Sequence, residues 1–200
     1  HKTLENYFKI KNHLLKSSEI RIYNYDDNYL RSSFKKLAKG LWVSLDYKNI
    51  EDCDFWLDKK GYLVEKGIKL FHSNALKIKG KHNILNLLLA TAAARKIGLT
   101  RESIKNSLKT YKQLPHRLET IYNAKNLVVI NDSKATNFDS SFSGIQSLNK
   151  GQLIIIGGRI KKGDSKLWSS IIIEKCKGVF LYGESSKELK RILLKAGFIE

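Results

Sequence analysis

Short apolar runs alternate with helical segments through the second half of the chain, and this alternation limits the folds open to it. The apolar runs occupy residues 127–130, 153–156 and 179–182. Helices are predicted at residues 138–148, 166–175 and 185–196. Such an order is typical of a parallel sheet wound by helices on both faces. The sequence therefore predicts an α/β fold with a doubly wound, Rossmann-like second half.

The first half of the chain mixes helices with shorter strands. Thr3 can cap a helix that runs to about Lys16, and Gly80 opens an almost wholly apolar helix that ends near Ile97. Short strands are predicted at residues 19–24, 41–45, 55–57, 62–64, 68–71 and 75–78. Pro115 is the only proline and separates these elements from a hairpin at 118–130. We place a domain boundary there and predict domains at 1–114 and 115–200.

Composition narrows the functional classes. The formal net charge of +18 invites a nucleic-acid interpretation, but the lysines are spread along the whole chain without a zinc-finger or ribonucleoprotein motif. A solvated lysine-rich surface or an anionic substrate explains them better. No apolar run is long enough to insert into a membrane. The two cysteines, Cys53 and Cys176, fit no disulfide or zinc pattern, which predicts a cytoplasmic protein.

The polar stretch at residues 131–137 reads Asn-Asp-Ser-Lys-Ala-Thr-Asn and lies between a predicted strand and a predicted helix. Strand-to-helix junctions are where α/β proteins place ligand contacts. An ordinary capped turn is the alternative. Gly157 and Gly158 end a later strand in the same way, where backbone amides and a nearby lysine could hold an anion.

Two helices of the first half also carry candidate site residues. Lys11 lies in the apolar stripe of its helix, so its amine either reaches solvent or is desolvated with a lowered pKa. His82, Asn83 and Asn86 are the polar exceptions at the start of the apolar helix. Asn83 and Asn86 are three residues apart and share a face, so they can cap the helix or contact an adenine edge.

Five motifs occur in an order that resembles the Mur ligases, in particular the members that add D-glutamate. They are the Lys11 helix, Gly-x-His-Asn-x-x-Asn at 80–86, Leu-Pro-His-Arg-Leu-Glu at 114–119, residues 131–137, and Gly157-Gly158 with Lys161. The string at 131–137 is the most specific, because other Mur ligases and folylpolyglutamate synthetases carry an Asp-x-Ala-His type motif there. Leu118 stands where that family often has Phe.

The resemblance implies a fold of two domains, the latter part of a central ATPase domain at 1–114 and a truncated Rossmann-like ligase domain at 115–200. The phosphate loop, the N-terminal domain and the family's Ser-Pro-Ala-Cys-Ala-Ser segment are not found in the sequence. We therefore expect a piece of a longer enzyme that does not ligate by itself. The resemblance also implies a monomer.

Site roles follow from the resemblance residue by residue. Lys11 matches a carbamylated lysine that helps to bind Mg²⁺. The residues that match ATP contacts are His82, Asn83 and Asn86 near adenine, Arg117 near phosphate and Asp132 near the ribose. The residues that match the D-glutamate side are Lys134, Thr136 and Lys161, with Lys162 as a rival for Lys161. Lys11, Lys134 and Lys161 are the predicted catalytic lysines.

The implied reaction is an ATP-dependent amide ligation in peptidoglycan synthesis, through an acyl phosphate. Its substrates would be UDP-N-acetylmuramoyl-L-alanine and D-glutamate, with ATP and Mg²⁺. Closure about Pro115 would assemble the site. Two alternatives remain open, another amino-acid ligase of the same superfamily and a basic nucleic-acid-binding module.

Overall fold

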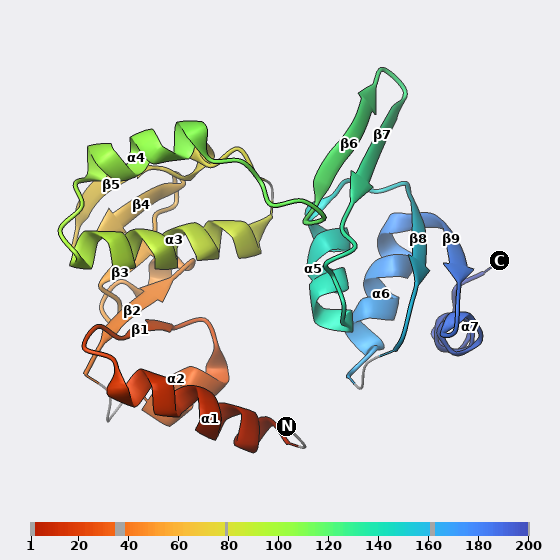
Figure 1. The fold of residues 1–200 in the computed structure, drawn as a ribbon, viewed down its shortest axis with the longest axis horizontal. Helices are drawn as coiled ribbons and strands as arrows, with labels where there is room; N and C mark the ends of the chain where they lie inside the picture. Colours follow the sequence, from red (N-terminus) through yellow and green to blue (C-terminus); the bar gives the residue numbers. More distant parts are fainter. Residues whose placement is uncertain (1–2, 35–38, 79, 161–162, 200) are drawn as a thin grey trace. The chain divides into compact units, whose positions relative to one another are not determined.

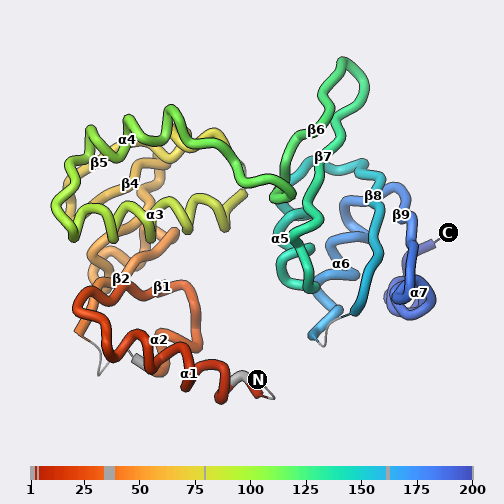
Figure 2. The backbone as a smooth tube through the Cα atoms, in the orientation of Figure 1, coloured from red at the N-terminus to blue at the C-terminus, as the bar shows by residue number. Residues whose placement is uncertain are grey.

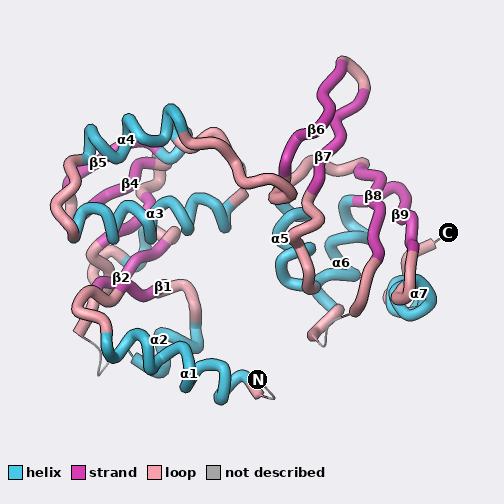
Figure 3. The backbone as a smooth tube through the Cα atoms, in the orientation of Figure 1, coloured by secondary structure: helices cyan, strands magenta, loops and turns pink. Residues whose placement is uncertain are grey.

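The computed structural model describes residues 3–34, 39–78, 80–160 and 163–199. Contacts within the chain divide it into two compact units (Figures 1 and 2). The first comprises His1–Lys77 and Asn83–Tyr111, and the second comprises Ile78–His82 and Lys112–Glu200. Among the described residues, the first unit has one sheet and two buried clusters, and the second has two small sheets and one buried cluster. The mixed α/β class predicted from the sequence is confirmed (Figure 3).

A five-stranded sheet organises the first unit, with the strands in the order β1-β2-β3-β4-β5. The strands are β1 (Ile22–Asn24), β2 (Leu41–Ser44), β3 (Phe55–Leu57), β4 (Tyr62–Glu65) and β5 (Ile68–His72). β1, β2 and β3 pair in parallel, whereas β3, β4 and β5 pair antiparallel. The turns between the antiparallel strands use left-handed backbone at Gly61 (φ +82°), Lys66 (φ 45°) and Gly67 (φ +87°).

Helices pack against this sheet and bury its apolar face. They are α1 (Leu4–Ser17), α2 (Asn28–Phe34), α3 (Lys81–Lys96) and α4 (Arg101–Thr110), with 3₁₀ turns at Tyr47–Asn49 and Ser73–Ala75. As predicted, Thr3 caps α1 through its side chain. Thr100 caps α4 through its side chain as well. α3 brings Leu88 and Ala92 into one cluster with Val43, Phe55 and Leu63.

The second unit contains two small sheets and three helices. The elements are β6 (Glu119–Ala124), β7 (Leu127–Asn131), α5 (Phe138–Ser147), β8 (Gln152–Gly157), α6 (Lys166–Lys175), β9 (Cys176–Tyr182) and α7 (Ser186–Lys195). β6 and β7 form an antiparallel hairpin, and β8 pairs with β9 in parallel. The three helices bury Ile145, Trp168, Ile172, Leu189 and Leu193 against Ile154, Ile156, Val179 and Leu181 of the parallel pair.

The structure corrects two details of the sequence prediction. The strand predicted at 75–78 is wrong, because the amides of Asn74 and Leu76 bond to His72 Nδ1 and to the Ser73 carbonyl within the 3₁₀ turn. β8 was predicted as a strand buried on both faces. In the second unit as described, Leu153 is 69% exposed and Ile155 is 74% exposed, so only one face of β8 is covered.

Candidate functional site

The loop at residues 131–137 joins β7 to α5 and is tightly hydrogen-bonded. The Ser133 amide donates to Asn131 Oδ1 at 3.1 Å, and the Ala135 amide donates to the Asp132 carbonyl at 2.8 Å. Asn137 caps α5, because its Oδ1 accepts from the Ser140 amide at 2.8 Å. The capped turn considered from the sequence is therefore present, but it accounts only for the last residue of the loop.

A second turn, residues 116–118, is bonded to this loop. The Leu118 amide donates to Asp132 Oδ1 at 3.0 Å, and the Lys134 amide donates to the His116 carbonyl at 3.0 Å. His116 and Leu118 both have left-handed backbone, with φ of 64° and 48°. Side chains other than glycine adopt this conformation at a cost, and such residues concentrate at functional sites. The two turns thus hold the exposed Arg117 beside Asp132.

Within the second unit, the charges of Asp132 and His82 affect each other's pKa. Burial raises the pKa of the Asp132 carboxyl, although the Leu118 amide and the charges of His82 and Arg117 act in the opposite direction. Burial lowers the pKa of His82, the Arg117 charge lowers it further, and Asp132 opposes both effects. Gly144 of α5 leaves room for the Asp132 carboxylate, since a Cβ at this position would lie 2.5 Å from Asp132 Oδ2.

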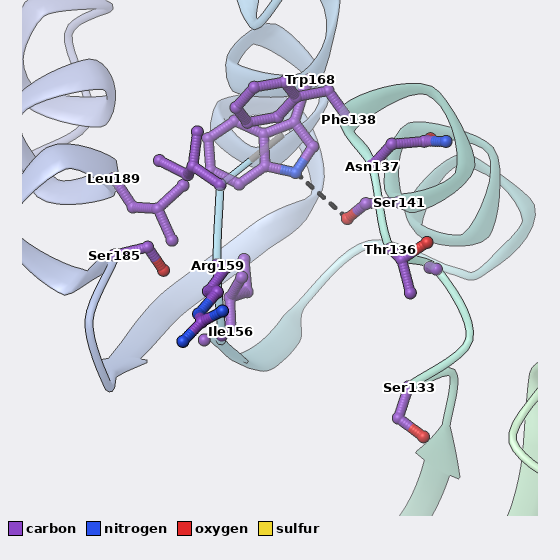
Figure 4. Close-up of a pocket in the computed structure, with 14 residues that line it drawn as sticks. Ser133, Thr136, Asn137, Phe138, Ser141, Ile156, Arg159, Trp168, Ser185 and Leu189 are labelled. Carbon is purple, nitrogen blue, oxygen red and sulfur yellow. Dashed lines mark hydrogen bonds between the residues drawn. The ribbon is translucent and has the colours of Figure 1, made fainter. Parts of the chain in front are cut away.

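A pocket of about 340 Å³ lies beside the later residues of this loop, from Ser133 to Asn137 (Figure 4). It is lined by Ser133, Ala135, Thr136, Asn137, Phe138 and Ser141, by residues 156–160, and by Trp168, Ser185 and Leu189. Phe138 and Trp168 form an aromatic wall, with ring centroids 5.1 Å apart. The Trp168 indole N–H donates to Ser141 Oγ at 3.1 Å, so the wall is fixed by a hydrogen bond as well as by packing.

The predicted site residues are distributed unevenly over these features. Arg117 and Asp132 lie together at the bonded turns, and Thr136 lines the pocket. Lys134 is exposed. Lys161 and its rival Lys162 lie outside the described residues.

The predicted adenine contacts fall at the start of α3. Asn83 is half-buried and Asn86 is exposed. Both belong to the first unit, whereas His82 groups with the second. The sequence prediction that they share the first turns of one helix agrees with the bounds of α3.

Of the two environments that its apolar stripe left open for Lys11, the structure shows the one in which the side chain reaches solvent. Its side chain is exposed, and its Nζ lies 5.6 Å from the centroid of the Tyr7 ring. The stripe itself faces solvent in part, since Tyr7 is 46% exposed and Leu14 is 68% exposed. Among the described residues, no group of three or more His, Cys, Asp or Glu side chains is placed to hold a metal ion.

Sequence reasoning missed Arg159, Glu184 and Ser185, which follow the carboxyl ends of β8 and β9. Arg159 Nε and Glu184 Oε2 are 3.2 Å apart, and Ser185 is almost fully buried in the pocket wall. The available signal was positional. In parallel α/β sheets, ligands bind beyond the carboxyl ends of the strands.

Comparison with known proteins identifies the family. Residues 1–94 match the family model of the Mur ligase middle domain. The chain is 54% identical over 200 residues to the UDP-N-acetylmuramoylalanine–D-glutamate ligase of Prochlorococcus marinus strain MIT 9515. The matched region covers 99% of this chain and 42% of that protein. The chain belongs to the Mur ligase family.

Another relative agrees with this assignment, and a solved structure shares the fold. This Mur ligase chain is 38% identical to the ligase of the same name from Parasynechococcus marenigrum, over 99% of the chain and 43% of that protein. The crystal structure of the MurC ligase of Thermotoga maritima matches 98% of the chain and 45% of its own length, with a TM-score of 0.69 and 15% identity. At that identity the likeness concerns the fold alone.

Two further findings concern the length of the match and the helices of the chain. The chain spans about two fifths of the length of the curated relatives it matches. Within its described residues, the helices are all too short or too polar to traverse a lipid bilayer.

Proposed function

We propose that this chain forms part of an ATP-dependent ligase that joins D-glutamate to UDP-N-acetylmuramoyl-L-alanine. The observation that carries the proposal is the 54% identity to a ligase of that name over nearly the whole chain. The bonded turns at 116–118 and 131–137 add support, because they hold a cation and a carboxylate side by side at the end of a strand. We further propose a cytoplasmic, monomeric enzyme that neither binds nucleic acid nor inserts into membranes.

Five residues of the chain are proposed to contact the nucleotide. Arg117 would pair with phosphate oxygens, and the half-buried Asp132 carboxylate would accept hydrogen bonds from ribose hydroxyls. His82, Asn83 and Asn86 would contact the adenine. The lowered pKa of His82 favours the neutral imidazole, which can both donate and accept a hydrogen bond. In this proposal residues 1–114 act as the central domain and 115–200 as the C-terminal domain.

The amino-acid substrate would lie on the pocket side of the same loop. Thr136 lines the pocket, and its hydroxyl can donate to a carboxylate. Lys134 and Lys161 would supply positive charge for the carboxylates of D-glutamate and for the developing oxyanion. These roles separate the loop into a nucleotide face at Asp132 and an amino-acid face at Thr136.

Lys11 would contribute to Mg²⁺ binding as a carbamate. Carbamylation converts a cation into an oxygen ligand of the kind that Mg²⁺ prefers. The exposed position of Lys11 leaves its amine accessible to carbon dioxide. The Mg²⁺ ion would need further ligands, because the described residues contain no cluster of carboxylates and imidazoles that could bind it. A bound Mg²⁺ would neutralise phosphate charge, and Lys11 would help to hold it.

The reaction would proceed in two steps. The carboxylate of UDP-N-acetylmuramoyl-L-alanine attacks the γ-phosphorus of ATP, which forms an acyl phosphate and releases ADP. The neutral amine of D-glutamate then attacks the acyl carbon, and the tetrahedral intermediate expels phosphate and leaves the amide. The chain's own residues would act by positioning the reactants and by stabilising negative charge.

The test uses a chimeric enzyme in which this chain replaces the matching segment of the Prochlorococcus marinus ligase. We expect the chimera to form an amide from UDP-N-acetylmuramoyl-L-alanine with D-glutamate, and not with other amino acids. Lys134→Ala should lower kcat/KM for D-glutamate by roughly ten- to a hundredfold, the loss expected for a charge-assisted hydrogen bond. Lys125→Ala is the matched control, because Lys125 is exposed on the β6–β7 turn. Amide formation with an amino acid other than D-glutamate would reject the proposed substrate.

A further inference from the structure

Among the described residues, three hydrogen bonds join the turn at 116–118 to the loop at 131–137. Two of them use backbone groups of the turn, the Leu118 amide and the His116 carbonyl. The third runs between two side chains and joins Asn131 Nδ2 to His116 Nδ1 at 2.8 Å. Asn131 is the last residue of β7, so this bond links the end of the strand directly to the turn.

The second hydrogen bond of the Asn131 side chain fixes which of its atoms faces the histidine. Asn131 Oδ1 accepts from the Ser133 amide at 3.1 Å. A backbone N–H only donates, so the amide oxygen must face Ser133 and the NH₂ group must face His116. An NH₂ group also only donates, so His116 Nδ1 must be the acceptor and carries no proton in this arrangement. The neutral ring therefore carries its proton on Nε2.

Glu119 contacts the same histidine from the other strand of the hairpin. Glu119 and Asn131 lie opposite each other in the pairing of β6 with β7. Glu119 Oε2 accepts from the His116 amide at 2.8 Å and lies 4.0 Å from His116 Nδ1. A carboxylate favours a proton on the nearby ring nitrogen, whereas the Asn131 NH₂ group excludes one. The Asn131 group is the closer of the two, so it sets the tautomer of the neutral ring.

His116 in turn supports two cations of the proposed site. It precedes Arg117, and its carbonyl accepts from the Lys134 amide at 3.0 Å. Its backbone is left-handed, with φ of 64°, which is a costly conformation for a residue other than glycine. Such a turn persists only where surrounding bonds stabilise it. The bond from Asn131 to the ring is therefore one of the contacts that keep this turn, and with it Arg117 and Lys134, in place.

We propose that Asn131 is a positioning residue of the ligase site and that it acts through the bond from its NH₂ group to the His116 ring. The inference rests on the proposed ligase function. Asn131 itself would touch neither ATP nor D-glutamate. It would instead hold the turn that carries Arg117 and the carbonyl that binds the Lys134 amide. Small displacements of such groups lower the rate strongly, because the reactants must be held in one geometry.

Nuclear magnetic resonance on the ¹⁵N-labelled 200-residue chain tests the bond without ATP or turnover. At about pH 8, where an ordinary imidazole is neutral, the His116 proton should lie on Nε2, and a scalar coupling should connect Asn131 Nδ2 with His116 Nδ1. Asn131→Asp keeps the acceptor for Ser133 but replaces the donor by a second acceptor, so the ring proton should move to Nδ1. A proton on Nδ1 in the unsubstituted chain, or an unchanged tautomer in Asn131→Asp, would overturn the proposal.

The chimeric enzyme provides the functional measurement. Asn131→Asp should lower kcat/KM for D-glutamate by roughly tenfold, because it removes one hydrogen bond that positions Lys134. A role limited to the turn at Ser133 predicts normal kcat/KM for this variant, because that bond is kept, and this result would overturn the proposal. Asn126→Asp is the matched control, because it makes the same change at an exposed position between β6 and β7, and it should leave kcat/KM unchanged.

Two observations separate the possible failures. The indole resonance of Trp168, which is buried in the second unit, shows whether each variant is folded. A chimera that forms no amide, while the ring proton lies on Nε2, would reject the ligase function alone.

Discussion

The contact between Gly144 and Asp132 gives the sharpest stability prediction. Alanine is favoured over glycine inside a helix by about 1 kcal/mol, so Gly144→Ala in α5 would ordinarily stabilise the protein. Here the added Cβ would lie 2.5 Å from Asp132 Oδ2, which forces the carboxylate to move. That movement breaks the bond from the Leu118 amide to Asp132 Oδ1, and a hydrogen bond to a charged group contributes about 1.5–3 kcal/mol. We expect Gly144→Ala to destabilise the second unit by roughly 0.5–2 kcal/mol.

A double-mutant cycle separates the two effects. In an Asp132→Ala background the clash is absent, so Gly144→Ala should stabilise the second unit by up to about 1 kcal/mol. Urea unfolding of protein labelled with 5-fluorotryptophan provides the assay, because fluorine resonances distinguish Trp168 in the second unit from Trp42 and Trp56 in the first. If Gly144→Ala stabilises both backgrounds equally, Asp132 does not constrain this position and the reasoning is wrong.

Three further predictions concern a buried hydroxyl, a helix cap and a titrating carboxyl. Thr91 is 1% exposed and its Oγ1 has no partner among the described residues, so Thr91→Val should raise the free energy of unfolding of the first unit by about 1 kcal/mol. Thr110→Val should give no such gain, because the Thr110 hydroxyl bonds to the Ser107 carbonyl. Asn137→Ala removes the cap of α5 and should cost the second unit about 1 kcal/mol in urea unfolding, whereas Asn137→Asp should keep most of it. Burial raises the pKa of Asp132 above its ordinary 3.8. When the pH lies between 3.8 and the raised pKa, this carboxyl therefore binds more protons in the native state than in the unfolded state. This carboxyl therefore lowers stability as pH rises from 3.8 through the raised pKa, and the fall in the urea midpoint over that range should be smaller in Asp132→Asn.

Local chemistry made much of the fold predictable from the sequence. The helix start at Thr3 follows from a side-chain cap, and the antiparallel hairpin of β6 and β7 agrees with the hairpin predicted at 118–130. The loop at 131–137 was recognised as a strand-to-helix junction and lies there. These features depend on neighbours within a few residues, which the sequence displays directly.

Features that depend on distant packing were less accessible. The stripe around Lys11 predicted a buried face, yet Leu14 is 68% exposed, because periodicity cannot say what covers a helix. The run in β8 indicated burial on both faces, although Ile155 faces solvent. A serine immediately before a helix predicts a capping hydrogen bond. Ser185 makes no such bond because its backbone dihedrals are helical, and the sequence does not display those dihedrals.

Transfer of oxygen tests the proposed ligase reaction most directly. UDP-N-acetylmuramoyl-L-alanine with ¹⁸O in its carboxylate is supplied to the chimeric enzyme with ATP and D-glutamate, and the released phosphate is analysed by mass spectrometry. An acyl phosphate passes one carboxylate oxygen to the phosphate, so the account predicts one ¹⁸O per phosphate for each amide formed. Amide formation with unlabelled phosphate would contradict it.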